Sequence, residues 1–210
     1  MDKKHGMLKG LSNIFICEII DNADEYKEVG TPQHLIPAGE MTVSKSFEKA
    51  QHYFDNAMWE EIGTEAPSEM SLIGAAVRAA LLAWIEGKDV DAETGAILDD
   101  GDWHNKFFAI SGTKDYTDGT SEHFWFLKCS FGGAEEAAKT KDASTDAGGS
   151  TLPFTAYSTI HKFKNNKHMK VVRIDTATTK LKDEQNWTAQ VVTPDNLSTV
   201  CEKVAAAAAE

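Results

Sequence analysis

Short runs of β-branched and aromatic residues, separated by polar turns, make up most of the hydrophobic pattern of this chain. Residues 14–20 are apolar at nearly every position and end at Asp21-Asn22, which is typical of a strand buried on both faces. Residues 41–47 alternate imperfectly and predict another strand. Further strands are expected at residues 154–163, 171–174 and 187–192. The pattern therefore predicts a mainly β protein with antiparallel strands.

The strongest β signal is a hairpin formed by residues 107–110 and 124–127. Asp118-Gly119 lies between them, and glycine supplies the positive φ that a tight turn needs. Side chains along the second strand alternate between two faces. One is an ordinary core face, whereas the other carries Phe124 and Phe126 between charged residues. We expect this second face to pack against another surface, such as that of a second subunit.

Helical periodicity appears twice. Apolar residues recur at helical spacing before Gly87, which predicts one central helix that ends at this glycine. Thr193 before Pro194 predicts the start of a second helix near the C-terminus. The apolar residues of the first helix are Ile73, Val77, Leu81, Trp84 and Ile85, and those of the second are Leu197, Val200, Cys201 and Val204.

Residues 48–67 show neither the period of a strand nor that of a helix, so we expect a long loop there. A loop of this length is normally functional or disordered, and its aromatic residues argue against disorder. Residues 89–102 predict an acidic connection, and residues 137–150 an exposed polar loop. The chain is expected to divide into a flexible arm at 1–10, a β domain at 11–193 and a C-terminal helix or tail at 194–210.

Charge narrows the functional classes. With 33 acidic and 21 basic side chains, the chain of 210 residues carries a formal net charge of −12. A surface this negative repels phosphate groups, so binding to nucleic acid or anionic lipid is not expected as the main activity. Three widely spaced cysteines do not form a closed disulfide framework, which favours a reducing compartment. Residues 1–9 are polar and no apolar stretch is long enough to span a membrane, so we expect a soluble protein made in a cytoplasm.

Residues 99–104 are the densest group of potential metal ligands. An EF-hand loop counted from Asp89 would place Thr94 where glycine is needed and Asp100 where glutamate is needed, so that motif fails. We interpret the group as an acidic, solvated turn. A hydrolase would require it to bind a metal ion.

Other catalytic patterns are also missing from the sequence. The seven histidines lack the spacing of a zinc enzyme, and His123 and His161 are interpreted as residues of strands. Cys17 and Cys129 lie in apolar strands, where buried thiols are expected. The chain has neither a nucleophile elbow nor a phosphate-binding loop. We therefore expect no enzyme, no metal and no cofactor.

Several stretches resemble the major tail proteins of long-tailed, non-contractile bacteriophages, the siphophages. They are Gly10-Leu11-Ser12-Asn13-Ile14-Phe15 at the first strand, the hairpin at 107–112 and 123–131 after a helix, and the polar stretch from 134 to 156. The resemblance runs over most of residues 8–200. Many relatives carry an additional immunoglobulin-like domain at the C-terminus, which this chain is too short to hold.

The resemblance implies an antiparallel β-sandwich or barrel with one flanking helix. Six copies of such a tail tube protein close into a ring, and the rings stack into a virion tail through which DNA passes into the host. The implied partners are the chain itself, the tape measure protein, and the tail terminator or distal tail proteins. DNA would pass without specific binding, because a negative bore repels its backbone. No membrane partner is implied.

Two sets of residues are candidates for this role. Candidate contacts between subunits are His52, Tyr53, Phe54, Trp59, Phe124 and Phe126. Candidate acids facing the bore are Glu40, Glu48, Glu69 and Glu122. The alternative function is that of a carbohydrate-binding, adhesin-like β-sandwich, which would use Trp59 or Trp103 as a stacking platform.

Overall fold

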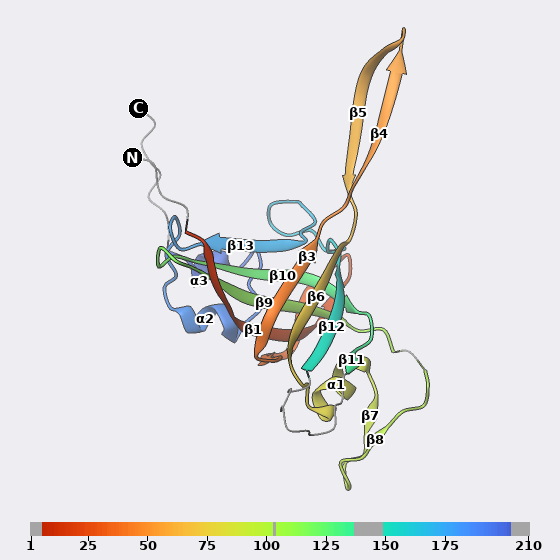
Figure 1. Ribbon diagram of the computed structural model, residues 1–210, viewed down its shortest axis with the longest axis vertical. Coiled ribbons are helices and arrows are strands. Elements are labelled where there is room, and N and C mark those ends of the chain that lie inside the picture. Colours follow the sequence, from red (N-terminus) through yellow and green to blue (C-terminus); the bar gives the residue numbers. More distant parts are fainter. Residues whose placement is uncertain (1–5, 103, 137–148, 203–210) are drawn as a thin grey trace, which may run out of the picture.

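A computed structural model describes residues 6–102, 104–136 and 149–202 (Figure 1). The fold is mainly β, as predicted, and its largest part is an antiparallel sheet in the order β2-β1-β9-β10-β12-β6-β3, with β11 joined to β12 and β13 joined to β10. The sheet comprises β1 (Leu8–Asp21), β2 (Tyr26–His34), β3 (Ala38–Ser44), β6 (Ser68–Ala75), β9 (Phe107–Tyr116), β10 (Ser121–Phe131), β11 (Glu135–Glu136), β12 (Gly149–Ala156) and β13 (Val171–Asp175).

Two hairpins and three short helices complete the described chain. The hairpins are β4 (Phe47–Phe54) with β5 (Ala57–Glu65) and β7 (Asp89–Val90) with β8 (Ile97–Leu98). The helices are α1 (Ala79–Glu86), α2 (Glu184–Ala189) and α3 (Leu197–Val200).

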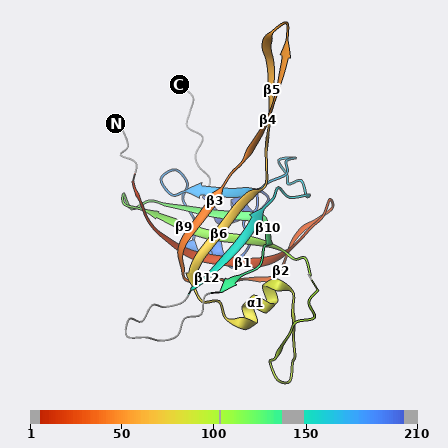
Figure 2. The ribbon, with the colours of Figure 1, turned by 45° about the vertical axis from the view of Figure 1, so that its right-hand side comes forward.

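The sheet divides at β10. One edge of β10 pairs with β9, while the other pairs first with β13 and then, from Cys129 onward, with β12. Strands β12, β6 and β3 cross over β1, β9 and β10, so the sheet curls back on itself (Figure 2). Helix α1 lies at one end of the curl, where the ring of Trp84 meets that of Phe108 at 5.2 Å.

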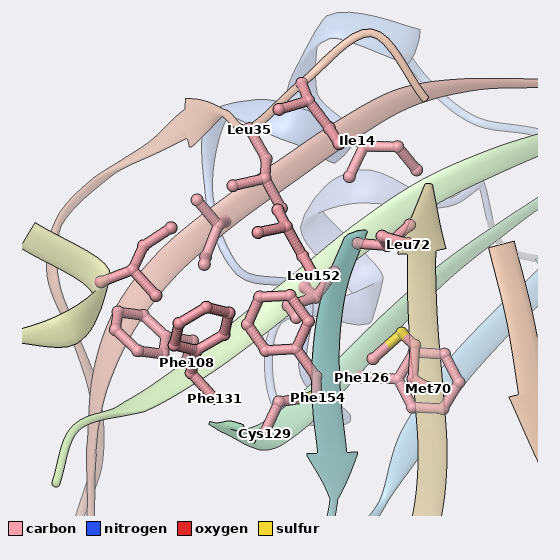
Figure 3. Packing of buried hydrophobic residues seen from close by; sticks show 14 of the residues in the cluster. Ile14, Leu35, Met70, Leu72, Phe108, Phe126, Cys129, Phe131, Leu152 and Phe154 are labelled. Atoms are coloured by element: carbon pink, nitrogen blue, oxygen red, sulfur yellow. The ribbon is translucent and has the colours of Figure 1, made fainter. Parts of the chain in front are cut away.

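Hydrophobic side chains form one cluster on each side of β1, β9 and β10. The inner cluster lies inside the curl (Figure 3), and the outer cluster lies between these strands and the C-terminal segment. Large members of the inner cluster are Ile14, Met70, Leu72, Phe108, Phe124, Phe126 and Phe154. Large members of the outer cluster are Trp125, Leu127, Phe163, Ile174 and Trp187.

A register shift in β10 decides which side chains enter the inner cluster. Phe126 lies opposite Ile110 and Cys129 opposite Phe108, so β10 contains one more residue than β9 over this interval. The extra residue turns the following side chains to the other face. Cys129 and Phe131 therefore join Phe126 in the inner cluster, although strict alternation would separate them from it.

The prediction that Phe124 and Phe126 contact another subunit is wrong. Their exposed fractions are 0% and 1%, and their rings pack edge to face at 5.6 Å within the inner cluster. The sequence pattern showed an apolar face that had to be covered. Strands β12, β6 and β3 of the same chain cover it.

The predicted strands at 14–20, 107–110, 124–127 and 171–174 are confirmed, and so is most of the strand at 41–47. Leu8–Gly10, which we expected in a flexible arm, belong to β1 and pair with β9. The strand expected at 154–163 ends with β12 at Ala156. Of the loop expected at 137–150, residues 137–148 lie outside the described chain, and Gly149 and Ser150 belong to β12.

The central helix is shorter than predicted. It begins after Arg78 and ends at Gly87, whose φ of 73° confirms the predicted stop. Ile73 instead belongs to β6, because this segment pairs with β12 on one side and β3 on the other. Two strand partners outweigh the helical spacing of a few apolar residues.

At the C-terminal end, the strand expected at 187–192 is replaced by α2. Asp183 caps this helix, because its side chain accepts a hydrogen bond from the backbone N–H of Gln185 at 3.0 Å. Trp187 is fully buried, and its carbonyl accepts a 2.9 Å bond from Nε1 of Trp125. The second predicted helix is present as the single turn α3, which follows Asn196 rather than Thr193.

The three cysteines are buried and free. Burial is the main cause that raises the pKa of Cys17 to about 11, and it also raises the pKa of Cys129 far above its ordinary value. The predicted buried thiols at these two positions are therefore confirmed.

Gly112 faces Phe124 across the β9–β10 pair. A Cβ on Gly112 would collide with the ring of Phe124 and would come within 2.8 Å of Cδ1 of Ile14. We expect Gly112→Ala to lower the free energy of unfolding by roughly 1–3 kcal/mol, the usual cost of overpacking a core. Urea denaturation would measure the change. Gly10→Ala in β1 is the control, since its nearest neighbour is Oδ2 of Asp115 at 3.8 Å, and equal effects in the two variants would contradict this account.

His123 is buried on the same face of β10 as Trp125, beside Trp187 of the C-terminal segment. Its Nδ1 lies 3.0 Å from Oγ1 of Thr113, and its ring lies 5.7 Å from that of Trp187. Burial lowers the pKa of His123 below its ordinary 6.5, although Glu184 and Asp115 oppose the shift. Within the described chain, Nε2 has no hydrogen-bond partner to stabilise the charged form.

Stability should therefore depend on pH through His123. When the pH lies between the pKa of His123 in the folded protein and its pKa of about 6.5 in the unfolded chain, only the unfolded chain binds the proton. The free energy of unfolding therefore falls as the pH drops below about 6.5. When the pH is lowered from about 7.5 to about 5.5, the urea midpoint of unfolding should fall less in His123→Gln than in the parent protein. The other titrating groups are common to both proteins, so parallel pH profiles would refute the role of His123.

Candidate assembly surfaces

The segment expected to be a long loop at 48–67 is instead a β-hairpin. Strands β4 and β5 pair along their length and project away from the sheet (Figure 1, Figure 2). Asp55 and Asn56 form the turn with φ values of 51° and 60°. Such a pair of left-handed residues is typical of a two-residue hairpin turn, so the Asp55-Asn56 dipeptide was the signal that the period analysis missed.

Every residue of β4 and β5 is exposed. Directly opposed residues of an antiparallel pair share a face, so Ala50 lies beside Ile62 on one face and His52 lies opposite Glu60. Near the tip, the rings of Phe54 and Trp59 meet edge to face at 6.4 Å. We call the face with Ala50, His52, Phe54, Trp59 and Ile62 the apolar hairpin face, although Glu48, Glu60 and Thr64 also lie on it.

The opposite face of the hairpin carries polar groups bonded to one another, together with Phe47, Tyr53 and Met58. Nζ of Lys49 lies 2.6 Å from Oε1 of Glu61, and Gln51 donates to Oε2 of Glu61 at 3.1 Å. The Lys49 and Gln51 bonds hold the pKa of Glu61 below its ordinary value. The hydroxyl of Tyr53 donates to Oε1 of Gln51 at 2.9 Å. Its polar groups are therefore bonded to each other, whereas no other described segment of the chain covers the rings of Phe54 and Trp59 on the apolar hairpin face.

Lys170 anchors the base of the hairpin. Its Nζ donates to Oε1 of Glu65 at 3.0 Å, to the carbonyl of Ala66 at 2.8 Å and to Oγ of Ser68 at 3.2 Å. The backbone N–H of Ala66 also donates to the carbonyl of Ser46 at 2.9 Å. The hairpin is thus fixed at its root and free along its length.

The structure brings four of the candidate contact residues together, because His52, Tyr53, Phe54 and Trp59 all lie toward the tip of the hairpin. Trp59 is 76% exposed, more than most tryptophans in folded chains. Trp103, the other candidate stacking platform, lies outside the described residues.

The candidate bore acids lie in three places. Glu40 on β3 and Glu69 on β6 are exposed on the outer face of the curled strands, opposite the inner cluster. Glu48 is exposed on β4. Glu122 on β10 lies 3.3 Å from Nζ of Lys114 and 3.4 Å from a guanidinium nitrogen of Arg173, so two cations balance its charge.

The outer face of β3, β6 and β12 is not covered by any other described part of the chain. Its outward side chains are Glu40, Thr42, Ser44, Glu69, Ser71, Ile73, Thr151, Pro153 and Thr155. They include two acids and no lysine or arginine. A shallow hollow of about 310 Å³ lies on this face, beside Glu69 and Pro153.

Residues 89–102, which carry β7 and β8, form an acidic arm at the end of the molecule opposite the β4–β5 hairpin (Figure 1). Lys88 at its root lies 2.5 Å from Oδ1 of Asp99 and 3.7 Å from Oδ1 of Asp100. The Lys88 ammonium lowers the pKa of Asp99, and Asp99 in turn raises the pKa of Lys88. His104 contacts only Asp100, at 3.3 Å. Over the described residues, no three His, Cys, Asp or Glu side chains are grouped to hold a metal ion.

A buried ion pair fixes the start of the segment that follows β12. Asp21 Oδ2 accepts from Nζ of Lys128 and from the backbone N–H of Ile160, both at 2.8 Å, and its Oδ1 accepts from the N–H of His161 at 2.9 Å. The exposed fractions of the two charged side chains are 0% for Asp21 and 7% for Lys128. His161 is therefore held through its backbone, in a loop rather than in the predicted strand.

Removing the charge of Asp21 would leave Lys128 buried without a partner. We expect Asp21→Asn to lower the free energy of unfolding by about 3 kcal/mol, as measured by urea denaturation at neutral pH. Glu18→Gln is the matched control, because the 3.2 Å pair of Glu18 with Lys106 is partly exposed and should contribute under about 1 kcal/mol. Similar losses in the two variants would contradict the special role of Asp21.

No protein-family model matches this chain, and no curated protein matches it. Among solved structures, the sheath–tube complex of an extracellular contractile injection system, PVC, in the extended state has a TM-score of 0.42 at 11% identity, over 77% of this chain and 87% of that chain. The tube-terminating cap of the anti-feeding prophage has a TM-score of 0.42 at 10% identity, over 77% and 87%. The PVC sheath/tube terminator has a TM-score of 0.41 at 12% identity, over 77% and 92%.

A likeness at this level carries no conclusion about fold or function.

None of the helices in the described ranges has the length and apolar character needed to cross a membrane.

Proposed function

We propose that this chain is a structural subunit of a phage tail tube, of the kind found in siphophages, which assembles with copies of itself into hexameric rings that stack into a tube. DNA passes through the tube on its way to the host. The partners at its ends and interior are tail terminator, distal tail and tape measure proteins. The resemblance of residues 10–15 and 107–131 to major tail proteins supports this proposal.

The observation that carries the proposal is the uncovered β4–β5 hairpin. A two-stranded ribbon is marginally stable in water unless something packs on it. Here the apolar hairpin face is exposed, with exposed fractions of 60% at Phe54, 76% at Trp59 and 50% at Ile62. An exposed apolar patch on a folded protein marks an interaction site, and in the proposed ring a neighbouring subunit would cover this one.

The outer face of β3, β6 and β12 is the surface that best suits the wall of the bore. It is polar, it carries Glu40 and Glu69, and it lacks basic side chains that would hold a phosphate backbone. Glu48 would lie at the hairpin, toward the next subunit. Glu122 remains a weaker candidate, because Lys114 and Arg173 neutralise it.

Deleting the hairpin tests the proposal. Ser46 and Ala66 are already hydrogen-bonded to each other, so a short Asn-Gly turn can replace residues 47–65. The free energy of unfolding of the variant should lie within about 0.5 kcal/mol of that of the parent, because no residue of the hairpin belongs to either hydrophobic cluster. It should fail to form the rings or tubes that negative-stain microscopy is expected to reveal for the concentrated parent protein.

Two substitution variants refine the result. Phe54→Ser with Ile62→Ser disrupts the apolar hairpin face and should also abolish assembly. Lys49→Ala with Gln51→Ala changes the polar face and should leave assembly intact. A parent protein that stays monomeric at every concentration would overturn the proposal, as would tubes formed without the hairpin.

The exposed ring of Trp59 also favours a second candidate, a carbohydrate-binding module in which this ring stacks on a sugar. A glycan-array signal from the monomer that disappears in Trp59→Ala would support this alternative.

A further inference from the structure

Charge is distributed unevenly between two short segments of the chain. The acidic arm, residues 89–102, contains six acidic residues and no lysine or arginine. Residues 161–170 contain four lysines and two histidines and no acidic residue. We call residues 160–170 the basic loop. In a chain with a net charge of −12, a basic segment of this density is unexpected.

These two segments lie on opposite sides of the sheet along the long axis of the molecule (Figure 1). Lys170, at the end of the basic loop, binds the base of the β4–β5 hairpin. That base lies at the upper end of the sheet in Figure 1, whereas β7 and β8 lie at the lower end of the long axis. One molecule therefore presents the acidic arm and the basic loop on opposite sides of the sheet.

The basic loop is held in shape before any partner arrives. Phe163 is buried in the outer cluster, and Asp21 accepts the backbone N–H groups of Ile160 and His161. Asn166, with φ of 56°, forms a turn in which its N–H donates to the carbonyl of Phe163 at 2.7 Å. A surface ordered in this way loses little conformational entropy on binding.

The charges of the basic loop point to solvent. Lys162, Lys164 and Lys167 are exposed, and none of them forms an ion pair with a carboxylate of the described chain. Nζ of Lys164 donates to the carbonyl of Asp195 at 3.1 Å, and the backbone N–H of Lys164 donates to Oδ1 of Asp195 at 2.8 Å. Ile160, with 52% of its surface exposed, supplies an apolar centre beside these lysines.

The acidic arm has the complementary arrangement. Val90 and Ile97 lie opposite each other in the β7–β8 pair, so their side chains share one face, and they are 45% and 39% exposed. Asp89, Glu93 and Asp102 belong to the same arm and form no ion pair with any described residue. An apolar centre with a charged rim is the usual anatomy of a docking surface.

We propose that the acidic arm of one copy docks on the basic loop of a second copy, which joins subunits head to tail. This inference rests on the proposed self-assembly and names the two surfaces that meet in it. Like ends repel, so two arms or two basic loops do not pair, and the contact is heterologous. A contact of this type propagates from copy to copy, as rings and stacks require.

Charge reversal tests the proposal. Lys162→Glu with Lys167→Glu leaves two lysines and two glutamates in residues 161–170, so the basic loop loses its positive charge. Glu93→Lys with Asp102→Lys leaves four acidic residues and two lysines in the acidic arm, so most of its negative charge is lost. Each variant alone should need at least about tenfold more protein to assemble than the parent, as measured by light scattering and sedimentation. An equimolar mixture should recover assembly, because the unchanged acidic arm of the first variant can dock on the unchanged basic loop of the second, and the charges introduced on the other two surfaces have opposite signs.

The matched control is Lys27→Glu with Lys180→Glu. Both lysines are exposed outside the basic loop, and the pair changes the net charge by the same amount as Lys162→Glu with Lys167→Glu. The control should assemble like the parent. Added salt should weaken the parent contact and relieve the repulsion in each reversed variant.

The outcomes separate this inference from the proposed function. A parent that assembles while the reversed variants behave like the control overturns the docking of arm on loop and leaves the tail tube proposal standing. Loss of assembly in both variants without recovery in the mixture also overturns it, because the two surfaces then do not meet. A parent that never assembles overturns both proposals.

Discussion

Burial of both faces of β10 requires a layer of structure on each side of it. Phe124 and Phe126 point into the inner cluster, and Trp125 and Leu127 into the outer one, with exposed fractions of 0% to 1%. Antiparallel sheets often leave one face to water, but these adjacent aromatic side chains favour covering both. The curl of β12, β6 and β3 covers one face and the C-terminal segment covers the other. The extra residue in β10 lets Cys129 join the inner side as well.

Local chemistry was sufficient to predict the elements whose signals lie within a few residues. Asp118-Gly119 predicted the turn of the β9–β10 hairpin, and Gly119 has φ of 85°. Gly87 predicted the end of α1. By contrast, alternation along β10 distinguished two faces without showing what covers Phe124, because the covering strands come from distant parts of the sequence.

The remaining errors have tertiary causes. Ile73 has helical spacing to the residues after it, but β6 has strand partners on both edges. Trp187 resembles a strand residue by type, yet Asp183 caps a helical turn that places its ring in the outer cluster. Of the candidate site, the aromatic tip of the hairpin was found from composition. The complementary charges of the acidic arm and the basic loop became meaningful only when the fold placed them on opposite sides of the sheet.

The buried thiols bear on what happens when such a particle moves from a reducing to an oxidising environment. Disulfide exchange requires an accessible thiolate, and Cys17, Cys129 and Cys201 are all buried with raised pKa values. Subunits crowded side by side would therefore not become covalently crosslinked through these residues. In the tail tube that we propose, the chain would therefore leave the cell without a change in its sulfur chemistry, and noncovalent contacts alone would hold the subunits together.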